Sequence, residues 1–241
     1  MDHEPEVPHQ GKRRGLPMLK GLMVYLRALV REYSLGKILP SSAPEGRYWY
    51  QQKHIDLNAL RNGRVVDIGS GEYPFPHADV LVELYPEDDR HRGGNAFLND
   101  GRPVVVADVD RLPFRDRSFD VVVCSHVLEH VDDPEKACHE LMRVARRGYI
   151  ETPTYCKDVL FAWTGHIHKW HIVQINNALV FFEYNQRQRE GIRASAWRDI
   201  ILGPLSHPLK RSFWENQDLF NVMFVWEGSF EVVVYRQEKS K

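Results

Sequence analysis

The stretch "RVVDIGSGEYPFPHADVLVEL", residues 64–84, decides the fold. Its first apolar run ends in Gly69 and Gly71, two glycines one residue apart, and its second apolar run ends at Glu83 and Leu84. A strand that runs into a glycine-containing turn and is followed by a second strand is typical of nucleotide-binding α/β proteins. The pattern leaves open which nucleotide binds there.

Strands and helices alternate beyond this stretch. A helix is predicted to begin at Asp133, whose side chain can cap it, and to end at Gly148. Near-continuous Val, Ile, Leu and Phe runs indicate parallel strands that are buried on both faces. The fold class is therefore α/β, with a doubly wound sheet. Strands are predicted at residues 64–68, 80–84, 104–107, 119–124 and 148–151.

The pattern changes after Thr152. Residues 170–184 predict a β-hairpin that turns at Asn176 and Asn177, and residues 219–236 predict a second, antiparallel hairpin at the end of the chain. A short helix is predicted at 194–202. We expect a disordered tail at 1–15, a helical segment at 16–60 and one domain at 61–241, in which 152–211 is an insertion.

Composition limits the functional classes. The net charge of −1 gives no nucleic-acid footprint, and specific nucleic-acid binding is not expected. The three cysteines form no CxxC pair, which favours buried thiols in a reducing compartment, and no apolar run is long enough for a membrane span. A cytoplasmic protein is predicted. Its basic N-terminal helix is either a solvated face or a peripheral membrane contact.

The residues after Gly71 distinguish between two nucleotides. Pro74 occupies the third glycine position of a dinucleotide fingerprint, and residues 72–79 hold two prolines, so the helix that binds a pyrophosphate cannot form normally. This disfavours NAD. S-adenosylmethionine (SAM) has no phosphate, and its ammonium and ribose groups need acids. Asp67, Glu83 and Asp108 follow three successive strands, although each acid could instead merely cap a loop.

Two segments resemble a known family. "VVDIGSG" (65–71) and "ADVDRLPFRDRSFDVVVCSHVLEHVDDPEKACHELMRVARRGYIETP" (107–153) are similar to the class I SAM-dependent methyltransferases, especially the group with an LPF…SFD…LEH pattern. The resemblance covers roughly residues 60–155. It implies a mostly parallel, seven-stranded Rossmann-like sheet with an antiparallel C-terminal hairpin. The cofactor-binding residues that it implies are Asp67, Gly69, Ser70, Gly71, Glu83, Asp108, Val109 and Ser125.

Methyl transfer requires alignment of the acceptor, and a hydroxyl acceptor also benefits from a general base. His126 and His130 of "SHVLEH" are the catalytic candidates, with packing of a helical turn as the alternative role for His130. A metal bound by the nearby histidine cluster is conceivable, but no acidic or cysteine ligand is fixed by spacing, and no metal is assigned. The acceptor-binding candidates are Glu151, Trp163, His166, His168, Trp170 and His171. Some of these aromatic and histidine residues could instead pack under the predicted hairpin.

The sequence thus predicts a SAM-dependent methyltransferase that acts on a small-molecule, glycan or lipid-linked acceptor. Two alternatives remain open. One is a SAM-binding regulatory module without turnover, and the other is an NAD-dependent oxidoreductase, which Pro74 disfavours.

Overall fold

The computed structural model describes residues 56, 62–89, 92, 95–160, 167–195 and 216–238, all within one compact unit, Ser42–Lys241. Several predictions lie outside these residues: the tail at 1–15, nearly all of the helical segment at 16–60, the part of the helix at 194–202 beyond Ser195, and the candidates Trp163 and His166. None of the helices in the described part of the chain has the length and apolar composition that a bilayer crossing requires.

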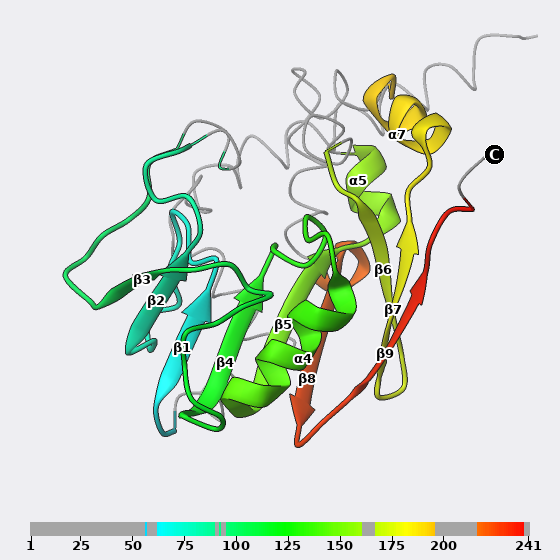
Figure 1. Ribbon diagram of the computed structural model, residues 1–241. Helices are drawn as coiled ribbons and strands as arrows, with labels where there is room; N and C mark the ends of the chain where they lie inside the picture. The colour runs from blue at the N-terminus through cyan, green and yellow to red at the C-terminus, as the bar shows by residue number, and fades with distance from the viewer. Residues whose placement is uncertain are drawn as a thin grey trace, which may run out of the picture. The chain divides into compact units, whose positions relative to one another are not determined.

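A six-stranded sheet forms the centre of the fold, in the order β3-β2-β1-β4-β5-β8 (Figure 1). The first five strands are parallel, whereas β8 runs antiparallel to β5. The order along the chain reverses between β1 and β4, where α/β proteins bind ligands beyond the carboxyl ends of the strands. The strands are β1 (Val65–Ile68), β2 (Val80–Glu83), β3 (Val104–Val106), β4 (Phe119–Ser125), β5 (Ala145–Pro153) and β8 (Asn221–Glu227).

A second, three-stranded sheet lies beside the first. The predicted hairpin is confirmed: β6 (Trp170–Ile175) and β7 (Ala178–Glu183) are antiparallel, and Asn176 adopts a φ of 52° in the turn. The third strand is β9 (Glu231–Tyr235), which pairs with β7 in parallel. Apolar residues of this small sheet join the same core cluster as those of the large sheet.

The predicted C-terminal hairpin is wrong. β8 and β9 belong to different sheets, so the described residues form six plus three strands rather than one seven-stranded sheet. The cause is the corner between them. Gly228 has a φ of 75°, and the buried Phe230 packs against Phe224 and Trp226, with ring centroids 5.2 and 5.3 Å apart. This anchor directs the chain away from β8 and toward β7.

The predicted helix is α4 (Pro134–Val144), and Asp133 caps it by accepting a hydrogen bond from the Lys136 N–H at 3.2 Å. It ends four residues before Gly148, which lies inside β5. A Cβ at Gly148 would lie 2.5 Å from the carbonyl oxygen of Val122 on β4. Gly148 therefore allows close approach within the sheet and does not end the helix.

Three further helices were not predicted: α5 (Tyr155–Leu160), α7 (Gln186–Arg193) and α10 (Gln217–Phe220). A capping box between Asn185 and Gln188 starts α7. In Figure 1, α5 lies above the carboxyl end of β5, toward the edge of the sheet where the parallel strands end.

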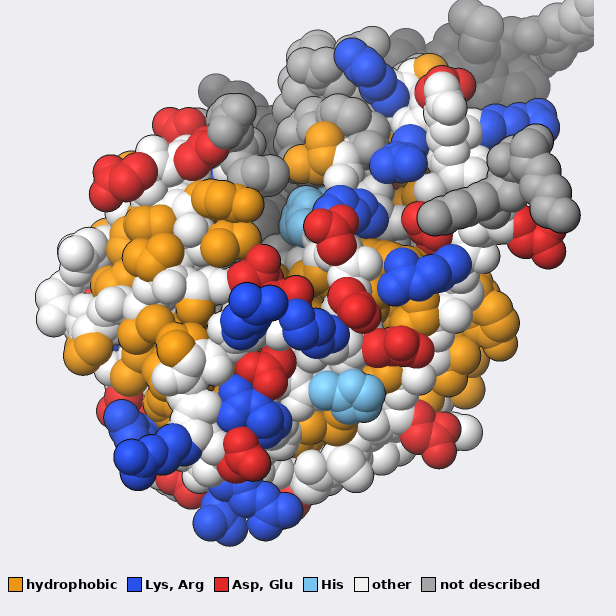
Figure 2. Space-filling view, in the orientation of Figure 1, with side chains coloured by type: hydrophobic (Ala, Val, Ile, Leu, Met, Phe, Trp, Pro, Cys, Tyr) orange, Lys and Arg blue, Asp and Glu red, His pale blue; other side chains and the backbone are white. Residues whose placement is uncertain are grey.

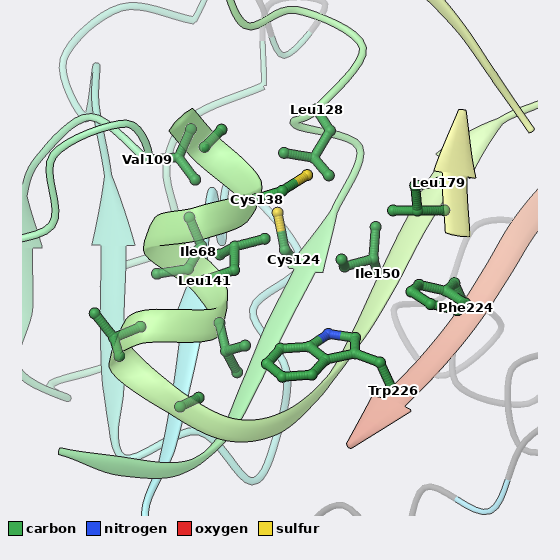
Figure 3. Close-up of a cluster of buried hydrophobic side chains, with 14 of the residues drawn as sticks. Ile68, Val109, Cys124, Leu128, Cys138, Leu141, Ile150, Leu179, Phe224 and Trp226 are labelled. Carbon is green, nitrogen blue, oxygen red and sulfur yellow. The ribbon is translucent and has the colours of Figure 1, made fainter. Parts of the chain in front are cut away.

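α4 covers one face of the large sheet. Figure 3 shows its Cys138 and Leu141 directed at Ile68, Cys124 and Ile150 of the strands. The outer side of this layer bears interspersed acidic and basic side chains, as Figure 2 shows. Burial raises the pKa of the Cys124 and Cys138 thiols well above the usual range, so these two cysteines are inert core residues, as expected.

Candidate active site

The turn after β1 is organised by a buried acid. Asp67 accepts a hydrogen bond from the Phe75 N–H at 2.7 Å, which pulls the proline-rich segment back over the strand. Residues 71–79, all of which are described, contain no helix, as the two prolines predict. The Asp67 carboxylate thus holds the loop at the place where a dinucleotide-binding protein would present a helix N-terminus.

The two glycines of this turn have different roles. Gly69 and Gly71 have φ values of 68° and 54°, a region that suits glycine. A Cβ at Gly69 would lie 2.3 Å from Cγ2 of Val127, so the space there is taken by the loop after β4. A Cβ at Gly71 would make only an ordinary contact, 3.5 Å from Cδ of Arg92. Of the two, Gly71 leaves more room for a ligand to approach the backbone.

Glu83 lies at the carboxyl end of β2, as predicted, and faces the same turn. Its carboxylate accepts hydrogen bonds from the N–H groups of Gly71 (3.1 Å) and Tyr85 (3.3 Å), and Arg92 lies 3.7 Å away. Ser70 is buried, and its hydroxyl makes no hydrogen bond within the described part of the chain. A buried hydroxyl without a partner beside two acids and an open glycine turn fits the polar groups of SAM.

The segment after β3 is fastened to α4. Asp108 is exposed and accepts the Asp110 N–H at 3.2 Å, whereas the side chain of Val109 is buried in the core, so only its backbone remains for a ligand. Glu140 accepts the Leu112 N–H at 2.7 Å, and Arg143 donates to the Leu112 carbonyl oxygen at 3.0 Å. The LPF part of the family pattern is thus held in place by two side chains of one helix.

His126 directly follows Ser125, the last residue of β4, and its ring lies between two buried carboxylates. Nδ1 is 3.2 Å from Oε1 of Glu129, and Nε2 is 3.1 Å from Oε1 of Glu151. The His126 side chain is 29% exposed, against 1% and 0% for the two acids. Lys157 on α5 places its Nζ 3.2 Å from Nε2. The ring is thus held from several sides and remains partly open to solvent.

Both ring nitrogens of His126 thus face a carboxylate oxygen. Burial, the largest influence, opposes ionisation of Glu129, but the hydrogen bond from His126 and the charges of His130, His126 and His168 together lower the pKa of Glu129 to about 2. A neutral imidazole has one N–H, so His126 can donate to both carboxylates only as an imidazolium. The pair of acids would therefore stabilise the ring after it has taken a proton.

Two acceptor-binding candidates prove to be core residues. Trp170 is 2% exposed and donates through Nε1 to the carbonyl oxygen of Val131 at 2.7 Å. His168 is 5% exposed, and its Nδ1 is 2.8 Å from Oδ1 of Asp158, which also accepts the Tyr184 hydroxyl. Since neither side chain is accessible, we replace the expectation that they contact an acceptor with a role in packing the loop after β4.

The remaining candidates differ in accessibility. Glu151 is fully buried, accepts a hydrogen bond from the Tyr149 hydroxyl and contacts His126, so its side chain is not accessible to an acceptor. His171 is partly exposed, and its ring lies 5.7 Å from that of Tyr155. His130 is half-buried, with its ring 4.7 Å from that of His168.

Sequence reasoning did not identify Lys157 and Asp158, which contact His126 and His168. Both lie on α5, a helix that the sequence did not predict. The signal was Thr154, whose hydroxyl accepts the Lys157 N–H at 3.4 Å and whose carbonyl accepts the Asp158 N–H at 3.1 Å. A threonine that precedes a short stretch with an acid in its first turn indicates a helix start.

Comparisons with known proteins agree with this architecture. A family model described as a methyltransferase domain matches residues 82–150. A demethylmenaquinone methyltransferase of Renibacterium salmoninarum is 30% identical over 118 residues, which is 44% of this chain and 47% of that protein. One from a Roseiflexus species is 37% identical over 99 residues, 36% of this chain and 40% of that protein. The chain thus spans half or less of the length of these relatives.

Among solved structures, a SAM-dependent methyltransferase of Thermotoga maritima is 22% identical, with a TM-score of 0.34 and coverage of 55% of this chain and 59% of that one. The family match begins at β2 and ends in β5. The match over residues 82–150 supports a SAM-dependent methyltransferase domain, and the mostly parallel α/β sheet agrees with it.

Proposed function

We propose that this chain transfers a methyl group from SAM to a small-molecule acceptor bound beside His126. The observation that carries the proposal is the position of this ring. It follows β4 at the reversal point of the sheet, it is partly exposed, and two buried carboxylates hold it. Val127, the next residue, lies against Gly69, so the histidine and the glycine turn belong to one crevice.

The cofactor would lie along the carboxyl ends of β1, β2 and β4. We assign the methionine end to the backbone of Gly69, Ser70 and Gly71 and to Asp67, and the ribose hydroxyls to Glu83. The exposed Asp108 and the backbone of Val109 would meet the adenine. Ser125 would lie beneath the cofactor at the end of β4.

SAM supplies a methyl group that is already activated by its sulfonium, so the protein mainly has to align the acceptor and exclude water. For a hydroxyl acceptor, His126 would take the proton as the oxygen attacks the methyl carbon. Glu129 and Glu151 would stabilise the resulting imidazolium. His130 would then be a positioning residue, because its ring nitrogen lies within 4.8 Å of the Glu129 carboxylate.

The acceptor class follows from two observations. Relatives named demethylmenaquinone methyltransferases support a small molecule, and glycan or lipid-linked acceptors fall within the same proposal. Tyr155 is 43% exposed and lies next to His171 near the carboxyl end of β5, so these two rings are the accessible candidates for an acceptor wall. Contact of the N-terminal basic helix with a membrane stays a prediction.

The test incubates the purified full chain with methyl-labelled SAM and a metabolite extract, and mass spectrometry identifies labelled products. His126→Asn is the main variant, because asparagine tolerates the φ of 58° at this position. We expect turnover to fall by roughly 10²- to 10⁴-fold, with SAM affinity within a few-fold of the parent chain. His139→Asn, which alters an exposed histidine on α4, is the matched control and should retain activity.

Other outcomes separate the alternatives. Calorimetry that shows SAM binding without any labelled product would favour a regulatory module, and binding of NAD in place of SAM would favour an oxidoreductase. A His126→Asn variant that transfers at the control rate would remove His126 from the chemistry. Asp67→Asn should abolish SAM binding in a folded chain, and unchanged affinity would overturn the cofactor assignment.

A further inference from the structure

Three side chains meet directly behind His126. Glu129, His130 and His168 each offer a ligand atom, and these atoms all lie within 4.8 Å of one another. The first two residues belong to the loop after β4, and the third precedes β6. The Lys169 N–H donates to the Glu129 carbonyl oxygen at 2.8 Å, so backbone hydrogen bonding holds the two segments together. The cluster therefore does not depend on side-chain contacts alone.

Glu129 has an unsatisfied oxygen. Its side chain is 1% exposed, and one oxygen, Oε1, contacts His126. The other, Oε2, is buried and accepts no hydrogen bond in the described part of the chain. Leaving a buried charged acceptor unpaired destabilises the folded protein. A cation bound at Oε2 would remove this cost.

His168 has the surroundings of a metal-ligating histidine. Its Nδ1 is bound to Asp158, and Asp158 is itself fixed by the Tyr184 hydroxyl at 2.8 Å. A histidine that ligates a metal through one ring nitrogen commonly binds a carboxylate through the other, which fixes the tautomer and the ring orientation. This arrangement leaves Nε2 of His168 for a ligand.

We propose that Glu129, His130 and His168 bind a Zn²⁺ ion. Two imidazoles and one carboxylate suit zinc, whereas Ca²⁺ and Mg²⁺ prefer oxygen ligands alone. Tetrahedral zinc with bonds of about 2.1 Å has ligand atoms roughly 3.4 Å apart. The three side chains would therefore have to close by up to roughly 1.4 Å from their present positions. A fourth position would remain for water or another group.

These three ligands differ from the sequence cluster of His166, His168 and His171, which the sequence analysis considered as a metal site. His171 stacks on Phe182 with ring centroids 5.9 Å apart, and His166 lies outside the described residues. The proposed ion would join the loop after β4 to the start of β6. Since Glu129 would bridge the ion and His126, zinc would also fix the ring that we propose as the base. The metal proposal itself does not depend on methyl transfer.

The experiment titrates the metal-free full chain with Zn²⁺ against a chromophoric chelator, and records the visible spectrum with Co²⁺ as a probe. We expect one tight equivalent of Zn²⁺ and a Co²⁺ spectrum of low coordination number. Glu129→Gln and His130→Asn should each weaken binding at least tenfold. Asp158→Asn, which keeps all three ligands, should weaken it by roughly 10- to 100-fold. His139→Asn, on the exposed side of α4, is the control and should bind as the parent does.

Circular dichroism confirms that each variant is folded. Should Glu129→Gln not fold, the half-buried His130 provides the same test through His130→Asn. Absence of a stoichiometric Zn²⁺ site in the parent chain would overturn the proposal. Equal affinity in the parent and in folded His130→Asn would do so as well, because the ion would then be held by other histidines of the chain.

Discussion

Two regions of the molecule differ in how their polar side chains contribute to the candidate active site. In the proposed cofactor half, residues 64–153, the strand-end acids Asp67 and Glu83 accept hydrogen bonds from the backbone of the turn between β1 and β2. In the other half, residues 154–238, the buried side chains of Trp170, His168 and Tyr184 turn inward. Trp170 and His168 bind Val131 and Asp158 and support the loop that presents His126.

The comparison shows that a sequence segment rich in aromatic residues can form either a ligand pocket or a buried packing unit. Trp, His and Tyr combine a large apolar body with a polar edge, which suits both a ligand pocket and a buried brace. Here the polar edges of Trp170, His168 and Tyr184 are all bound within the protein. These buried residues of the second half therefore brace the protein, and Trp170 fixes the loop after β4.

The largest effect that would test this contrast is the loss of Trp170. Trp170→Ala removes a fully buried indole and its hydrogen bond to Val131, and we expect the free energy of unfolding to fall by about 3–5 kcal/mol. Urea denaturation measures the change. Phe182→Ala, on the same hairpin but 39% exposed, is the control and should cost far less. If both variants lose an equally small free energy of unfolding, Trp170 is not a buried core residue.

Gly148 gives the next largest effect. Gly148→Ala would place a Cβ 2.5 Å from the Val122 carbonyl oxygen and 2.9 Å from Nε1 of Trp226. Because a backbone oxygen in the middle of a sheet cannot move away, we expect a loss of about 2–3 kcal/mol, within the usual range for overpacking. Gly191→Ala, in α7 with open space around it, should be neutral or stabilising by about 0.5–1 kcal/mol. Thermal melts of both variants measure these changes. A Gly148→Ala variant as stable as Gly191→Ala would mean that the sheet does not require glycine at position 148.

The error at Gly148 shows what could be predicted from the sequence and what could not. Strands β1 to β5 and α4 follow from local apolar runs and a cap, and the ends of those runs identified the acids Asp67, Glu83 and Asp108. The end of α4 did not follow, because Gly148 is required by Val122 and Trp226, which are distant in sequence. The prediction of a C-terminal hairpin was wrong for a similar reason. Phe230 packs against Phe224 and Trp226 at the corner between β8 and β9, and the local sequence pattern does not reveal this contact.

The glycine turn sharpens the comparison within the cofactor half. In Gly69→Ala, the new Cβ would lie 2.3 Å from Cγ2 of Val127, in the loop after β4, and alanine would have to adopt a positive φ. We therefore expect the free energy of unfolding to fall by roughly 1–3 kcal/mol and the SAM affinity to fall as well. Gly71→Ala meets no such overlap, and we expect a smaller loss of stability but a clear loss of SAM affinity. Calorimetry and melting curves on both variants separate packing from binding. Equal changes in stability and in SAM affinity in both variants would mean that the two glycines have the same role.

The smallest effect concerns the hydrogen bonds between α4 and the LPF segment. The Arg143 guanidinium holds the pKa of Glu140 below its usual range, and Glu140 also accepts the Leu112 N–H. A carboxyl with a lowered folded-state pKa adds stability above its unfolded pKa of about 4.3, and this stability is lost as the pH falls through the folded value. Glu140→Gln should therefore cost about 1 kcal/mol near neutral pH, and the gap from the parent chain should shrink as the pH falls below about 4.

Urea denaturation at several pH values measures this gap. Glu231→Gln, which alters an exposed acid on β9, provides the control and should show little difference at any pH. A Glu140→Gln gap that stays constant down to pH values well below about 4 would mean that the shape of the side chain, and not its charge, fastens the segment. In that case Arg143 would hold the LPF segment through its bonds to the Leu112 and Phe114 carbonyl oxygens alone.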